Sequence, residues 1–143
     1  MIEKKFETSM DRERQDKALF CLCTEQKLNY ETTNSLRGID AILMSGKNRL
    51  AFAEVKGVNE NFGEKEYVRI SVRKLHHCQK EQINEGIPTC IIWAFYDGIG
   101  YTWVKKIEGT VIWLGMKHPR PGSLWDRELM FYMNQDKLNY IKY

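Results

Sequence analysis

Apolar positions along the chain occur mainly in short runs, and these runs predict a protein built around a β-sheet. Two of them, at residues 38–45 and 49–57, flank the tripeptide Gly46-Lys47-Asn48. This tripeptide favours a tight hairpin turn because Gly and Asn tolerate positive φ. Both runs are apolar on both faces. We therefore expect the hairpin to lie centrally in a sheet that is covered on both sides.

Two helices and several further strands are predicted around this hairpin. The helices span residues 11–23 and 72–85, and the second begins after Ser71, a favourable N-cap, and ends at Gly86. Strands are predicted at residues 66–70, 89–95, 101–104, 111–114 and 138–143, with a short one near Leu28. Residues 124–132 fit either a strand or a helix, and residues 58–65 and 117–122 are predicted loops. This order predicts an α/β protein with a mixed central sheet flanked by helices.

Length and composition suit one globular domain. The chain has 143 residues, of which 43% are apolar and 29% charged, and this is enough for one hydrophobic core. No segment reaches the ~20 apolar residues of a membrane helix, and the first residues lack the apolar stretch of a secretory signal. We expect a soluble, intracellular, cytoplasmic protein with a core at about residues 10–104 and a C-terminal extension at about 105–143.

Cysteine usage and charge narrow the function only slightly. Cys21, Cys23, Cys78 and Cys90 include no C-x-x-C pair, so reduced, packed thiols are favoured over a disulfide scaffold. A zinc or iron–sulfur site that also uses the two adjacent histidines is the alternative, although its spacing matches no standard ligand pattern. The net charge of +3 permits a polyanionic partner without demanding one.

The predicted hairpin brings charged residues together on one face. Counting back from a turn at residues 46–48 places Ser45 opposite Arg49 and Asp40 opposite Glu54. Because side chains alternate between the two faces, Asp40, Glu54 and Lys56 project from the same face. Two carboxylates ~5 Å apart repel by roughly 3 kcal/mol at an effective dielectric constant near 20. The rest of that face is apolar, with Ile42, Met44, Leu50 and Phe52.

A divalent cation would offset this repulsion. Hard carboxylate oxygens suit Mg²⁺, for which Mn²⁺ can substitute. Mg²⁺ takes few protein carboxylates and keeps waters and substrate phosphate, so such a site could activate a water and orient a scissile phosphate. Lys56 could stabilise developing charge or position the attacking water. The alternative is a solvated ion pair at the end of a strand, which the tripeptide Glu54-Val55-Lys56 alone does not distinguish.

The same residues resemble the core motif of the PD-(D/E)xK nuclease superfamily, which includes restriction endonucleases and Holliday-junction resolvases. The similarity is sharp over residues 38–57, GIDAILMSGKNRLAFAEVKG, and extends over about residues 10–104. Asp40 matches the first acid, with Ile39 where the pattern has proline, and Glu54-Val55-Lys56 matches the E-x-K. The resemblance implies a restriction-endonuclease-like core of order αβββαβ and Mg²⁺-dependent phosphodiester cleavage. It also implies that Asp40, Glu54 and the backbone carbonyl of Val55 hold the metal.

The resemblance further implies site residues on the helices. Many family members carry an acid on the first helix, for which Glu13 is the best match and Asp16 the next. Some carry a glutamine or lysine on the second helix, where Gln79 falls within the predicted apolar stripe and Lys74 is the second choice. For each of these residues, an ordinary solvent-exposed polar side chain is the alternative.

The sequence therefore predicts a metal-dependent nuclease that acts on DNA, with an endonuclease favoured and RNA as the alternative substrate. A homodimer that cuts two strands is expected only by analogy, and no membrane partner is expected. Two other classes of protein stay open. One is a catalytically silent nucleic-acid-binding or assembly module on the same fold. The other is an unrelated binding protein in which the paired acids are a surface feature.

Overall fold

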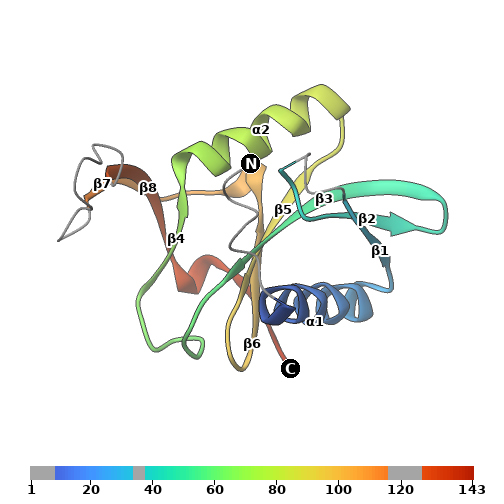
Figure 1. Ribbon diagram of the computed structural model, residues 1–143, viewed down its shortest axis with the longest axis horizontal. Helices are drawn as coiled ribbons and strands as arrows, with labels where there is room; N and C mark the ends of the chain where they lie inside the picture. The colour runs from blue at the N-terminus through green and yellow to red at the C-terminus, as the bar shows by residue number, and fades with distance from the viewer. Residues whose placement is uncertain (1–8, 34–37, 116–126) are drawn as a thin grey trace.

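The computed structural model describes residues 9–33, 38–115 and 127–143, which form two helices, nine strands and two short 3₁₀ turns (Figure 1). In chain order these elements are α1 (Ser9–Gln26), β1 (Asn29–Thr32), β2 (Ala41–Ser45), β3 (Asn48–Gly57), β4 (Tyr67–Ser71), α2 (Val72–Glu85), β5 (Thr89–Ala94), β6 (Gly98–Trp103), η3 (Val104–Lys106), β7 (Thr110–Gly115), β8 (Arg127–Asn134), η4 (Gln135–Lys137) and β9 (Asn139–Lys142). Within the described residues, no helix is long and apolar enough to cross a membrane.

The main sheet has six strands in the order β1-β2-β3-β5-β6-β9. Strands β3 and β5 are parallel, and every other neighbouring pair is antiparallel. A parallel pair needs a long crossover, which the chain provides through β4 and α2. The predicted mixed central sheet and the central position of the hairpin are confirmed.

The hairpin departs from the predicted turn. Ser45 pairs with Asn48 rather than Arg49, so the turn has two central residues and Gly46, at φ 61°, is the first of them. A bulge beside Leu43 and Met44 then restores the predicted register, in which Ile42 faces Phe52 and Ala41 faces Ala53. The extra residue in the bulge is Leu50, which is 42% exposed and so does not join the apolar neighbours of the acids.

A second, three-stranded antiparallel sheet has the order β4-β8-β7 and lies to the left of the main sheet in Figure 1. The strand predicted at residues 66–70 therefore forms, but it pairs with β8 rather than with the hairpin. The three strands of the main sheet that precede α2 are β1, β2 and β3. Residues 127–134 are a strand, while the loop predicted at 117–122 and residues 124–126 lie outside the described residues.

Each face of the main sheet has its own core, and Figure 1 shows α1 and α2 on opposite sides of the sheet. Helix α1 covers the face that carries Ala51 and Ala53 of β3. Helix α2 and the second sheet cover the other face, where Leu75 and Cys78 pack with Ile91 and Trp93. Because side chains alternate along β3, Phe52, Glu54 and Lys56 belong to the α2 side.

Helix α2 has clear boundaries at both ends. The Ser71 hydroxyl accepts a hydrogen bond from the Lys74 backbone N–H at 3.1 Å, as expected for an N-cap. Gly86 ends the helix at φ 70°, where its N–H donates to the Gln82 carbonyl. These caps fix where α2 begins and ends, and Lys74 lies in its first turn.

Candidate active site

Asp40 and Glu54 lie side by side where β2 begins. Asp40 immediately precedes β2, and its Oδ2 accepts a hydrogen bond from the Val55 backbone N–H at 2.7 Å. That bond holds the Asp40 carboxylate against β3, next to Glu54. Glu54 faces α2 and is only 6% exposed, whereas Asp40 is half-buried. The site therefore holds one deeply buried carboxylate and one that reaches toward solvent.

The two carboxylate oxygens of Glu54 have different surroundings. Oε1 lies 3.3 Å from the Lys74 ammonium nitrogen. Oε2 is buried and has no hydrogen-bond partner among the described residues. Burial and the neighbouring Asp40 charge raise the pKa of Glu54 to about 8, although Lys74 and the Asp40 backbone act in the opposite direction. A buried acceptor without a donor is costly, so Oε2 is a natural ligand position for a cation.

Lys74 links the acids to the segment before β2. Its ammonium group donates to the Gly38 carbonyl at 3.0 Å as well as contacting Glu54. Burial lowers the pKa of Lys74, but the Glu54 and Asp40 carboxylates outweigh this and raise it overall. Gly38 has φ +76°, and a Cβ there would lie 2.8 Å from the His77 ring. Glycine thus lets this segment pass close beneath α2, within reach of Lys74.

Lys56 lies two residues beyond Glu54 on the same face of β3. Its backbone pairs with Trp93 of β5, and its side chain is exposed. The two lysines thus have different surroundings. Lys74 is committed to the buried Glu54, whereas the Lys56 ammonium group is open to solvent.

The family model described as "Phage putative PDDEXK endonuclease" matches residues 1–141, nearly the whole chain. The chain belongs to this PD-(D/E)xK endonuclease family. The predicted resemblance is confirmed, whereas the assignment of the family motif to Asp40 and Glu54-Val55-Lys56 stays a prediction from the sequence. Ile39 stands where the pattern has proline, and it is buried in the apolar cluster with Ile42 and Phe52.

The fold is also similar to that of a solved Holliday junction resolvase. The structure of Hjc from Archaeoglobus fulgidus, a Holliday junction resolvase from an archaeal hyperthermophile, superposes with a TM-score of 0.53. The match covers 85% of this chain and 86% of that chain at 10% sequence identity. At this identity the likeness shows the fold alone, and it confirms the restriction-endonuclease-like class. No curated protein matches the chain.

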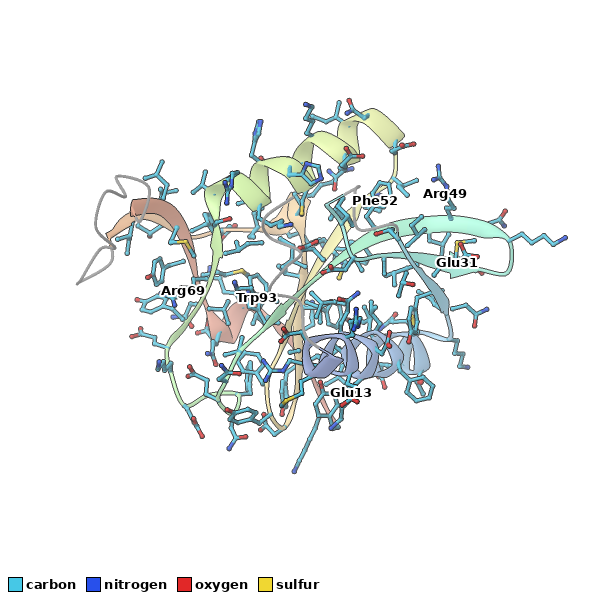
Figure 2. All side chains as sticks on the ribbon, viewed as in Figure 1. Glu13, Glu31, Arg49, Phe52, Arg69 and Trp93 are labelled. Atoms are coloured by element: carbon cyan, nitrogen blue, oxygen red, sulfur yellow. The ribbon has the colours of Figure 1, made fainter. Side chains whose placement is uncertain are left out.

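The two site residues expected on the helices lie elsewhere. Glu13 is exposed on α1, which covers the face of β3 opposite to Glu54, and Figure 2 shows it on the side of α1 away from β3. Its neighbour Arg14 lies against Gly57 at the end of β3 instead. Gln79 is exposed and lines a separate cleft. The residue of α2 that contacts Glu54 is Lys74, the second choice from the sequence.

Gln79 was misplaced because only part of the predicted stripe of Val72, Leu75 and Ile83 packs on the sheet. The buried residues of this helix are Leu75 and Cys78, while Ile83 is 79% exposed. The face that packs on the sheet is therefore rotated toward Cys78, and this rotation brings Lys74 over β3. The useful signal was Cys78, a small apolar residue one turn after Lys74.

Lys74→Met is expected to destabilise the protein mainly at high pH. Above about pH 8 the Glu54 carboxylate is ionised, and removing its cation leaves a buried charge poorly compensated. A loss of about 1–3 kcal/mol is expected there, with a smaller loss near pH 6, where Glu54 is protonated. Urea unfolding at both pH values measures the difference. Lys47→Met, in the exposed hairpin turn, is the matched control, and an equal loss at both pH values would contradict the pairing.

Proposed function

We propose that this protein is a divalent-metal-dependent endonuclease that hydrolyses phosphodiester bonds in DNA at Asp40 and Glu54. The observation that carries the proposal is the buried Glu54 Oε2, which has no donor among the described residues although it lies beside a second carboxylate. When both carboxyl groups are ionised they repel one another, and a bound cation would offset that repulsion. The family membership supports the proposal, because the sequence pattern of Asp40 and Glu54-Val55-Lys56 resembles a nuclease motif.

The donors fit Mg²⁺, with Mn²⁺ as a substitute. Asp40 and Glu54 would supply carboxylate oxygens, and Val55 its backbone carbonyl. In a strand the N–H and C=O of one residue point to the same side, so the Val55 carbonyl shares the side on which its N–H meets Asp40. Within the described residues, no group of three or more Asp, Glu, His or Cys side chains is arranged to hold a metal. Two carboxylates and a carbonyl suit Mg²⁺, which retains waters and substrate phosphate, better than they suit zinc.

The bound cation would act as a Lewis acid on the scissile phosphate and lower the pKa of an attacking water. The chain's own residues prepare the site for this chemistry. Glu54 must lose its proton before it can act as a ligand, and Lys74 favours the charged carboxylate and fixes the direction of Oε1. The Lys56 side chain is exposed on the same face of β3, where its ammonium group can approach a phosphate oxygen.

The choice of DNA and of an endonuclease rests on the family and on the neighbouring fold. The family description names an endonuclease, and the structural relative is a Holliday junction resolvase. The net charge of +3 is compatible with a polyanionic substrate. Branched DNA therefore belongs among the substrates to be tested, with RNA as the alternative. A homodimer would carry two such sites and could therefore cut both strands of a duplex.

Cleavage of labelled linear, circular and branched DNA, with Mg²⁺, Mn²⁺ or EDTA, tests the proposal. We expect circular DNA to be cut with either metal and to stay intact in EDTA. A nicked circular product would indicate that one strand is cut. A linear product would indicate coordinated cutting of both strands by two subunits. Cleavage only from free DNA ends would show that the protein is an exonuclease and not an endonuclease. DNA binding without any cleavage would instead support the alternative of a catalytically silent nucleic-acid-binding module on the same fold.

A further inference from the structure

A cleft of about 590 Å³ lies along α2 on the side away from the acids. In the main sheet β5 is flanked by β3 on one side and β6 on the other, and α2 packs over β5. Asp40 and Glu54 lie on the β3 side of the helix. The cleft lies on the β6 side, between α2 and the η3 turn that follows β6. Helix α2 therefore separates two polar sites.

The two sides of α2 differ in charge. His76, Gln79, Lys80 and Ile83 recur at the helical spacing and line the cleft. The acidic residues of α2 lie on the other side, in the row that begins at Lys74: Glu81 and Glu85. Glu85 is moreover 3.6 Å from the Arg49 guanidinium group, which offsets its charge. The acids of the helix thus point away from the cleft.

The lining of the cleft combines hydrogen-bond donors with apolar side chains. Lys80 comes from α2 and Lys105 from η3, so two exposed ammonium groups face one hollow from different elements. The amides of Gln79 and Asn84 add N–H donors, and Val104 and Ile107 are among the apolar side chains. No carboxylate belongs to this lining, whose residues all lie in the described part of the chain. Glu108, just beyond Ile107, is paired with Lys137 at 3.1 Å.

We propose that this cleft binds the phosphate backbone of the DNA substrate at a position outside the scissile site. The inference rests on the proposed function, because it assigns the cleft to the same substrate. An α-helix with its side chains is about 10–12 Å across, which is close to the ~12 Å width of the major groove of B-DNA. A duplex that lies over α2 can therefore reach the acids on one side of the helix and the cleft on the other.

Backbone binding predicts a specific dependence on salt. Each phosphate that a lysine neutralises adds about 0.9 to the slope of log affinity against log salt concentration. Removing both cations in Lys80→Ala/Lys105→Ala should lower that slope by about 2 and weaken binding on the order of tenfold at low salt. The change should be the same for different base sequences, because backbone contacts do not read bases.

Fluorescence anisotropy of a labelled duplex of about 30 base pairs, titrated in EDTA at several salt concentrations, measures the slope without cleavage. The charge-preserving variant Lys80→Arg/Lys105→Arg should keep the wild-type slope. Lys47→Ala/Lys142→Ala removes two exposed cations from the hairpin turn and from β9, and serves as the matched control. An unchanged slope in Lys80→Ala/Lys105→Ala, or an equal fall in the control, would overturn the inference.

Two further arms separate this inference from the proposed function. Cleavage with Mg²⁺ should show a raised KM for DNA in Lys80→Ala/Lys105→Ala and a wild-type KM in the matched control, since the cleft binds the substrate outside the scissile site. A protein that cuts DNA but whose salt slope does not depend on Lys80 and Lys105 refutes only the proposed DNA binding by the cleft. A protein whose DNA binding shows the cleft-dependent salt slope but which never cuts DNA refutes only the proposed nuclease activity. Displacement of the duplex from the cleft by inorganic phosphate at low concentration would indicate a free-anion site and would also overturn the proposal.

Discussion

Replacing Glu54 with glutamine is expected to reduce the rate of DNA cleavage by about 10³-fold or more, because it removes a charged ligand of the cation at the reacting centre. Glutamine keeps the size of the side chain, and its carbonyl oxygen can still accept from Lys74. The fold and the affinity for DNA in EDTA should therefore be retained. Initial rates of circle nicking with Mg²⁺ measure the effect.

The matched control for this prediction is Glu31→Gln. Glu31 is an exposed carboxylate on the edge strand β1, which is separated from β3 by β2. It should cut DNA at the wild-type rate. A Glu54→Gln variant that cuts as well as Glu31→Gln would mean that the buried acid has no part in the reaction.

Without metal, the wild-type protein is expected to lose stability as the pH rises from about 5 toward 8.5. The folded pKa of Glu54, about 8, lies above the value of 4.5 that is ordinary for a glutamate. Between these values the folded state binds more protons than the unfolded state, so stability is greatest below the unfolded pKa and is lost as pH rises through the folded one. The raised pKa of Lys74 acts only at still higher pH. A loss on the order of 1–3 kcal/mol corresponds to roughly 3–10 °C in Tm.

Thermal melts of wild type and Glu54→Gln over this pH range isolate the contribution of one carboxyl group. The difference in Tm between the two proteins should grow with pH, because glutamine cannot ionise. Saturating Mg²⁺ should recover the wild-type Tm at the upper end of the range, since a cation that binds only the native state stabilises it. Parallel pH profiles for the two proteins would show that Glu54 keeps an ordinary pKa.

The pairing of the two acids could be predicted from the sequence because it depends on local rules. Apolar strands joined by a short glycine turn fix a register, and the period of two then decides which residues share a face. The turn itself was wrong by one residue, yet the bulge at Leu50 restored the register near Asp40. A one-residue error without that bulge would have moved Glu54 to the α1 side.

Contacts between distant elements could not be predicted in the same way. Lys74 reaches Glu54 only because the buried face of α2 is centred near Cys78, which depends on how the helix packs against β5. The second sheet depends on pairing between β4 and β8, which lie far apart in the chain. Such pairing leaves little trace in a single sequence, because alternation shows that a strand exists but not which partner it has.

Binding of Mn²⁺ to the DNA-free protein tests the central claim most directly. Electron paramagnetic resonance of free Mn²⁺ at about pH 8.5, where Glu54 is ionised, measures that binding without any assumption about the substrate. The account predicts saturable binding by wild type and by Glu31→Gln, and its loss in both Asp40→Asn and Glu54→Gln. Equal Mn²⁺ binding by all four proteins would contradict the assignment of Asp40 and Glu54 as the metal site.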